Sequence, residues 1–225
     1  MHTMPETGNA RTVLVWDWPV RLFHWALVAL VPALYLTWRW NWMEWHALAG
    51  DALLTLLLFR VLWGFFGSDT ARFARFLASP TVALRYLAHL SGGESDIHAG
   101  HNPAGGWMVA AMLTLLLAQT LTGLYVQNDV ANEGPLTELI PAGIANAITA
   151  LHAILWNVIL VLVALHLLAI LAYAVMLRQD LVRPMLTGRE LLPASVPVPR
   201  IAGSAVALLL LGSAAGAAAL IALMI

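Results

Sequence analysis

Two histidines, His152 and His166, lie in the apolar stretch Leu151–Tyr173, which carries no charged residue. Fourteen positions separate them, which is close to four turns of an α-helix. Both rings should therefore leave the same helix face, about 40° apart in azimuth and about 21 Å apart along the axis. That separation is most of the ~30 Å hydrocarbon thickness of a membrane. Because ionisable side chains inside membrane bundles usually serve a function, this stretch predicts two ligand sites at two depths.

The composition indicates a membrane protein. Apolar residues make up 61% of the chain and charged residues 10%, against about 45–50% and about 25% in soluble domains. We predict an all-α membrane protein, because a helix satisfies its backbone hydrogen bonds internally. The absence of cysteine excludes disulfides, thiolate-held iron–sulfur clusters and covalently attached c-type haem. Any haem is therefore held non-covalently, as in a b-type cytochrome. With a formal net charge of -1, we expect no nucleic-acid partner.

The apolar pattern predicts a four-helix transmembrane bundle plus a fifth C-terminal transmembrane helix. We expect an N-terminal segment at 1–19, the bundle at 20–176, a linker at 177–200 and the fifth helix at 201–225. Inside the bundle, the expected spans are about 20–38, 46–66, 104–126 and 151–173. Two amphipathic helices are expected at about 70–78 and 80–89, and an extramembrane loop at 127–147. The N-terminus lacks a small-residue cleavage site, so we expect no removable signal peptide.

Cap residues mark the starts of two spans. Asp17 followed by Pro19, and Asn102 followed by Pro103, are typical of helix N-termini, where a polar side chain accepts a backbone hydrogen bond and proline fits the first turn.

The distribution of arginine predicts the orientation. All eleven basic residues are arginines, and ten of them fall in the N-terminal segment, the second-to-third connection, the fourth-to-fifth connection or the span ends that meet these. Only Arg39 falls on the other side. Cytoplasmic loops are enriched in basic residues, so the N-terminus and the amphipathic helices should be cytoplasmic and the C-terminus outside.

Four histidines then fall at two matched depths. His24 and His166 lie toward the inside, and His46 and His152 toward the outside. A six-coordinate haem iron takes axial ligands from both sides of the ring, and bundles build such sites from facing helices. The pattern predicts two bis-histidine haem sites. The alternative is that some of these rings only hydrogen-bond to a neighbouring helix.

Four other residues are candidates for contact with the haems. Gly50 and Gly123 would admit either a haem edge or a close helix contact. Arg60 falls at the depth of His24 and either offsets a haem propionate or extends to the headgroups. Arg21 is a candidate at the same end, with ordinary headgroup contact as the favoured alternative.

A second pair of histidines, His98 and His101, has the spacing H-x-x-H. Metal binding, proton transfer and an ordinary solvated loop with a helix cap remain open for this pair, with the solvated loop favoured.

The chain resembles the bacterial di-haem cytochrome b family that includes the cytochrome b subunit of nickel–iron hydrogenase and bacterial cytochromes b of the five-sixty-one type. The stretches that carry the resemblance are 15–25, 59–76, 100–106, 151–166 and 181–188. In that family, one histidine on each of the first two spans and two on the fourth bind the haem irons. The resemblance assigns these roles to His24, His46, His152 and His166.

The resemblance implies electron transfer between the quinone pool and a periplasmic redox partner, either a multihaem cytochrome c or a dehydrogenase subunit. We expect the quinone near the inner haem, close to Arg21, Arg60 and Gly100–Pro103, and the partner on the outer face. An electron-transfer subunit is favoured over a stand-alone enzyme, and a homodimer is left open. The alternatives are a superoxide:quinone oxidoreductase and a histidine-based metal or proton transporter, although a transporter would usually show broken helices or repeated halves.

Overall fold

Five helices in the computed structural model, which describes residues 10–89, 99–127 and 133–223, are long and apolar enough to cross a membrane. These are α1 (Trp18–Arg39), α2 (Met43–Phe66), α5 (Pro103–Gly123), α6 (Ala142–Met176) and α8 (Ser204–Leu223). The connections contain short helices and 3-10 turns at Asp69–Ala71, α3 (Phe73–Phe76), α4 (Pro80–His89), Thr137–Leu139 and α7 (Val182–Thr187). Two strands, β1 (Ala10–Leu14) and β2 (Arg189–Pro193), complete the described elements.

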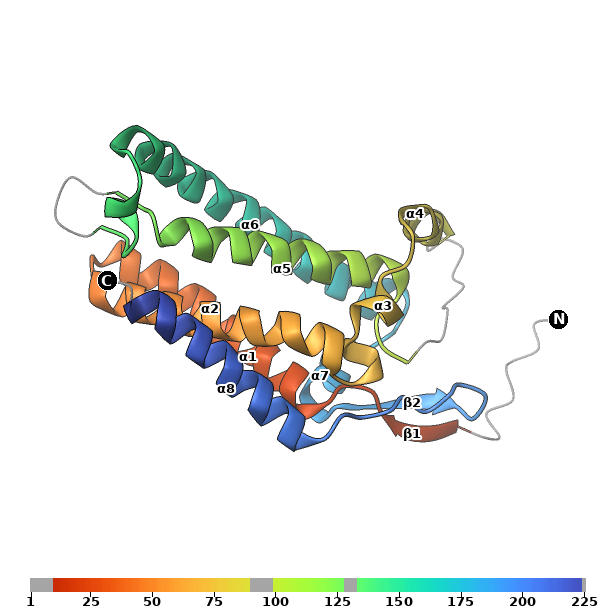
Figure 1. Ribbon diagram of the computed structural model, residues 1–225. Helices are drawn as coiled ribbons and strands as arrows, with labels where there is room; N and C mark the ends of the chain where they lie inside the picture. The colour runs from red at the N-terminus through yellow and green to blue at the C-terminus, as the bar shows by residue number, and fades with distance from the viewer. Residues whose placement is uncertain (1–9, 90–98, 128–132, 224–225) are drawn as a thin grey trace.

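The long helices form two layers, with α5 and α6 over α1, α2 and α8 (Figure 1). Helix α2 is central and packs against α1, α5 and α8. Helix α6 packs closely against α5, whereas its backbone stands apart from α1 and α2. Large side chains therefore bridge the space between α6 and the α1–α2 pair.

The predicted caps of two spans are confirmed. The Asp17 side chain accepts a hydrogen bond from the backbone N–H of Val20 at 2.8 Å, with proline in the first turn of α1. The Asn102 side chain accepts from the N–H of Gly105 at 2.7 Å, with proline again at the start of α5. Each carboxylate or amide oxygen satisfies a backbone donor that the helix itself leaves unpaired.

Buried polar groups join α1 to α2 at the same end. Asp17 is 1% exposed and also accepts a hydrogen bond from the indole N–H of Trp63 at 2.9 Å. Its charge interacts with that of Arg60, which is 2% exposed and donates to the carbonyl of Ala71 at 3.2 Å. Both groups are out of water, so the hydrogen bonds from Val20 and Trp63 to the carboxylate and from Arg60 to Ala71 satisfy them.

The strands β1 and β2 pair antiparallel, with Thr12 opposite Leu191. The pairing continues into the turn before β2, where the carbonyl of Gly188 accepts from the N–H groups of Val15 and Trp16 at 2.8 and 3.0 Å. This sheet was not predicted from the sequence, which shows no hairpin turn between the two segments. It fastens the start of the chain to the linker that precedes α8.

The short elements gather at the two ends of the bundle. Strands β1 and β2 and helices α3, α4 and α7 lie at the end that holds residue 10, and the C-terminal end of α8 lies at the other (Figure 1). The ten arginines that were expected to share a side belong to the elements and helix ends at the first of these ends. Arg39 lies alone at the opposite end, at the last turn of α1.

Two predicted boundaries were wrong. The amphipathic helix at 70–78 is instead a 3-10 turn and the single-turn helix α3, because the backbone of Arg72 is extended between them (φ -75°, ψ 129°). Helix α6, which contains the fourth span, begins at Ala142, so the last six residues of the expected loop at 127–147 are helical. Helix α4 at Pro80–His89 agrees with the prediction.

Candidate functional site

The structure brings His24 of α1 and His166 of α6 together. Their rings are close enough for their charges to interact, and both side chains are half-buried. Nδ1 of His24 is shielded from solvent and has no hydrogen-bond partner. Buried polar atoms are normally paired, but the part of the protein that the structure describes leaves this ring without an orienting hydrogen bond at Nδ1, unlike His46.

The second pair consists of His46 of α2 and His152 of α6, whose charges also interact. Nδ1 of His46 lies 2.9 Å from the carbonyl oxygen of Leu34 in α1. Because a carbonyl can only accept, Nδ1 carries the proton and Nε2 keeps a free lone pair. This is the tautomer that a metal-binding imidazole needs, and the carbonyl fixes the ring orientation.

Two side chains of α5 hold His152. The hydroxyl of Thr122 donates to the carbonyl of Ala118 at 2.8 Å, so its oxygen is free to accept from Nδ1–H of His152 at 3.0 Å. Nε2 of His152 then accepts from the amide of Gln119 at 2.9 Å. For Nε2 of His152 to bind iron, the amide of Gln119 would have to turn away. Oε1 of Gln119 is buried and unpaired, so no hydrogen bond through this atom holds the amide in place.

These second partners were not assigned in advance. Thr122 and Gln119 carry a visible signal, since they are polar residues in an apolar span, the first next to the last residue of α5 and the second about one turn before it. The carbonyl of Leu34 carries none, because backbone groups do not depend on residue type.

An aromatic pair lies between the two histidine levels. The rings of Tyr35 in α1 and Trp156 in α6 stack with centroids 5.5 Å apart and planes 8° apart. On α6, Trp156 lies about 6 Å along the axis from His152 and about 15 Å from His166. The stack therefore joins α1 to α6 at a depth nearer to the His46–His152 pair than to the His24–His166 pair.

The two candidate glycines have different surroundings. A Cβ at Gly50, one turn after His46, would meet no atom within 4 Å, so the space beside this backbone is open. A Cβ at Gly123 would lie 3.2 Å from Cε1 of His152. Gly123 therefore makes room for the imidazole ring of His152.

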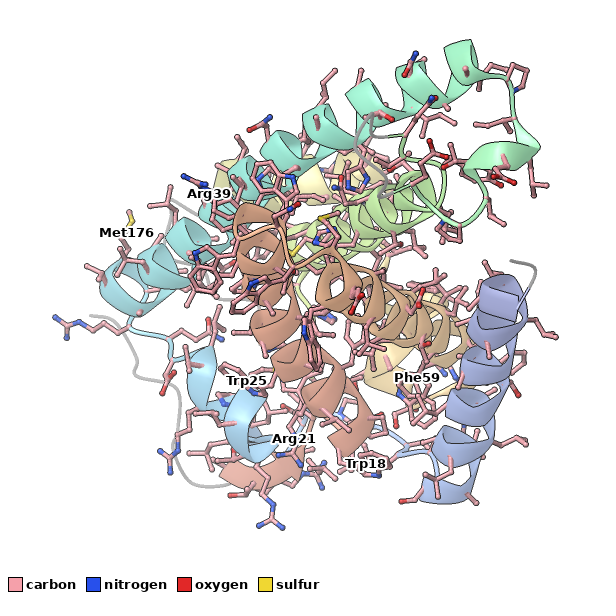
Figure 2. The ribbon with its side chains drawn as sticks, turned by 90° about the vertical axis from the view of Figure 1, so that its left-hand side faces the viewer. Trp18, Arg21, Trp25, Arg39, Phe59 and Met176 are labelled. Atoms are coloured by element: carbon pink, nitrogen blue, oxygen red, sulfur yellow. The ribbon has the colours of Figure 1, made fainter. Side chains whose placement is uncertain are left out.

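The alternative that Arg60 extends to the lipid headgroups was wrong. Its guanidinium is buried, bonds to Ala71 and lies over the ring of Phe73 at 5.6 Å from the centroid. Arg21 donates to the carbonyl of Leu186 at 2.6 Å. Figure 2 shows Arg21 and Trp25 along the same stretch of α1, beside α7. Arg21 thus fastens α1 to α7.

His101 does not belong to a solvated loop. Its ring lies between Trp16, at 4.6 Å between centroids, and Phe76, at 4.9 Å. Nδ1 is shielded from solvent and unpaired. Burial, followed by the charges of Arg60 and His166, lowers the pKa of His101 to about 3. The imidazole is therefore neutral at pH 7.

The described residues supply no further metal ligands beside His101, so the structure does not support metal binding by the H-x-x-H pair. His98 lies outside the described residues. Among the residues that are described, no group of three or more His, Cys, Asp or Glu side chains could hold a metal ion.

Facing histidines in an all-helical membrane bundle are typical of membrane-bound b-type cytochromes. The family model described as prokaryotic cytochrome b561 matches residues 15–188, and the chain belongs to this family. It is a membrane protein that binds b-type haem and takes part in electron transfer. No curated protein and no solved structure gives a significant match. Since the family match ends at Gly188, β2 and α8 lie beyond it.

Proposed function

We propose that the protein transfers electrons between the quinone pool and a periplasmic redox partner through two b-type haems. His24 and His166 would hold one haem, and His46 and His152 the other. The observation that carries the proposal is that the four histidines lie within electrostatic range of one another in two pairs, each joining α6 to α1 or α2, with the rings of the second pair oriented by hydrogen bonds to Leu34 and Thr122. Bound haem would supply one-electron transfer.

The chain's own contribution is to fix the rings. The carbonyl of Leu34 and the hydroxyl of Thr122 hold His46 and His152 through Nδ1. This leaves Nε2 of each ring as the nitrogen with a lone pair, which in His152 accepts from the amide of Gln119. Hydrogen bonds of this kind orient imidazole ligands and make them more basic. At the other level, Nδ1 of His24 has no partner in the described chain, so we expect the two haems to have different redox potentials.

The two levels lie toward opposite faces of the membrane. Their separation along α6 is about 21 Å, so two haems would connect one membrane surface with the other. The periplasmic partner, a multihaem cytochrome c or a dehydrogenase subunit, would dock beside the His46–His152 level. The quinone would bind at the His24–His166 level, where Arg60 and His101 are buried.

The orientation can be tested with reporter fusions. The proposal places the N-terminus and the 67–102 connection in the cytoplasm, and the 124–141 connection and the C-terminus in the periplasm. A phosphatase fused near Glu133 should be active, because it folds only outside, and one fused near Glu94 should be inactive. Equal activity at both positions would contradict the proposed topology.

Redox spectroscopy tests the function. Under anaerobic conditions, decylubiquinol should reduce the haems of the purified protein, and a soluble periplasmic cytochrome c should reoxidise them. A His24→Ala protein that keeps the outer haem should be reduced by quinol far more slowly, whereas a His89→Ala control should behave as wild type. Reduction of His24→Ala at the full rate would place the quinone elsewhere. A purified protein without redox-active haem would favour the transporter alternative.

A further inference from the structure

The ring of His101 is enclosed by segments that are far apart in the chain. His101 lies just before α5, and its ring lies between Trp16, which precedes α1, and Phe76 of α3. Gly100 has a φ of 109°, a conformation that glycine adopts readily, and a Cβ there would lie 3.3 Å from the Thr70 side chain. This turn brings the chain close to the segment after α2 and places the imidazole between the two aromatic rings.

One nitrogen of this ring has no partner in the described part of the chain. Nδ1 of His101 is shielded from solvent and accepts or donates no hydrogen bond there. Because water does not reach this atom, neither solvent nor a ligand from the protein surface satisfies it. Buried polar atoms are normally paired. The partner that Nδ1 lacks must therefore come from within the bundle.

The guanidinium of Arg60 is a second buried group with unused hydrogen-bonding capacity. Arg60 is 2% exposed, and its one hydrogen bond to a residue that the structure describes runs from Nη1 to the carbonyl of Ala71 at 3.2 Å. A guanidinium carries five N–H donors. The Asp17 carboxylate is within electrostatic range, but its oxygens accept from Val20 and Trp63. Most donors of Arg60 are thus available to another acceptor.

His101 and Arg60 lie beside the inner histidine pair, His24 and His166. His101 is within electrostatic range of both Arg60 and His166, and His166 is within range of His24. The surroundings are apolar, since the ring of Phe73 lies 5.6 Å from the guanidinium carbon of Arg60. An acceptor that reached both unused donors would therefore lie next to this pair and away from water.

A haem of the b type carries acceptors of this kind, because each ring bears two propionate carboxylates on one edge. A cysteine-free chain holds its haem without covalent bonds, so these carboxylates need other partners. A carboxylate inside a membrane bundle requires donors, because an unpaired charge out of water is costly. A guanidinium and the N–H of an imidazole both suit a carboxylate.

We propose that His101 is a haem-binding residue whose Nδ1–H donates to a propionate of the haem at the His24–His166 level, with Arg60 donating to the same carboxylate. The two donors would fix how this haem is turned in its site. They would also favour its reduced form, because a nearby positive charge and hydrogen-bond donors disfavour the extra positive charge of ferric iron. This inference rests on the proposed function, which places a haem between these histidines, and it does not depend on where the quinone binds.

The first test is a potentiometric titration of the haem-loaded protein, followed by visible spectra. His101→Phe keeps an aromatic ring between Trp16 and Phe76 but removes both nitrogens. We expect the redox component that His24→Ala removes to become about tenfold harder to reduce, which is about 59 mV for a one-electron couple, and the other component to stay unchanged. His89→Phe is the matched control, because the His89 ring is exposed and bonded only to a carbonyl of its own helix.

A second measurement detects the contact itself. In protein that carries haem with isotope-labelled propionates, the redox-induced infrared difference spectrum reports the carboxylate stretches of each haem. We expect the bands of one haem to shift in His101→Phe and to be as in wild type in His89→Phe. His101→Asn places an amide N–H at about the position of Nδ1, so it should restore part of both the band position and the potential. A purely structural role of the ring would give no such rescue.

The second donor and the possible loss of haem are covered by further variants. Arg60→Met, added to His101→Phe, should make the same redox component still harder to reduce. If His101→Phe loses this haem, the infrared bands of His101→Asn decide the matter instead. Wild-type bands, with both reduction equilibria within about twofold of wild type in the haem-loaded variants, would overturn the inference.

The other outcomes separate this inference from the proposed function. A shift confined to the component that His46→Ala removes would also overturn the inference, because the propionate would then belong to the other haem. In either case, continued reduction of both haems by decylubiquinol leaves the proposed function standing. A His24→Ala protein that keeps every haem component would overturn the proposed function and the inference together.

Discussion

Alanine at His24 or at His166 is expected to remove the same haem, and alanine at His46 or at His152 the other. A bis-histidine iron loses half of its axial ligands in each variant, and the histidines interact in these pairs in the structure. The haem content, measured as pyridine haemochrome per protein, should fall from two to one in each single variant. A potentiometric titration should lose one and the same component within each pair.

The double variants make the test sharper. His24→Ala with His166→Ala should still retain one haem, whereas His24→Ala with His152→Ala should retain none. His89→Ala, which changes an exposed histidine outside the bundle, should keep both. If His24→Ala and His152→Ala abolish the same redox component, the pairing by depth is wrong.

Alanine at Asp17 should be among the most destabilising single changes in the protein. The carboxylate caps α1, accepts from Trp63 and faces the buried charge of Arg60. Losing the cap costs about 1–2 kcal/mol and losing the hydrogen bond from Trp63 to a charged acceptor about 1.5–3 kcal/mol. The buried charge of Arg60 also loses its favourable interaction with the carboxylate. Thermal or denaturant unfolding in detergent, followed by circular dichroism, should show this loss.

Two further variants separate the contributions. Asp17→Asn keeps an oxygen for the cap and for Trp63 but removes the charge, so its loss of stability should be smaller. Adding Arg60→Met to Asp17→Ala should restore part of the stability, because no unpaired buried charge remains. If Asp17→Ala unfolds within about 0.5 kcal/mol of wild type, the buried pair does not stabilise the bundle.

Residue types and their spacing predicted the features that depend on helix periodicity and charge. The five spans, the caps at Asp17 and Asn102, and the concentration of arginine at one end followed from local pattern alone. The structure also brings the histidines together in the pairs that were expected from their depth, although their binding of haem iron stays a prediction.

Other features depend on contacts that local sequence does not encode. For Arg60, depth in the span left two alternatives open, and only the fold of the segment after α2 supplies the carbonyl of Ala71. His101 was expected in a solvated loop, because its burial depends on Trp16 from the other end of the matched region. The β1–β2 sheet escaped prediction for the same reason: two short strands from distant segments have no turn between them to signal the pairing.

The β1–β2 pairing also constrains the order in which the protein is made. Strand β1 precedes the five spans in the chain, but its partner β2 follows the fourth span. The sheet therefore cannot form until His24, His46, His152 and His166 have all been synthesised. Closure of this end of the bundle is thus a late step of biogenesis.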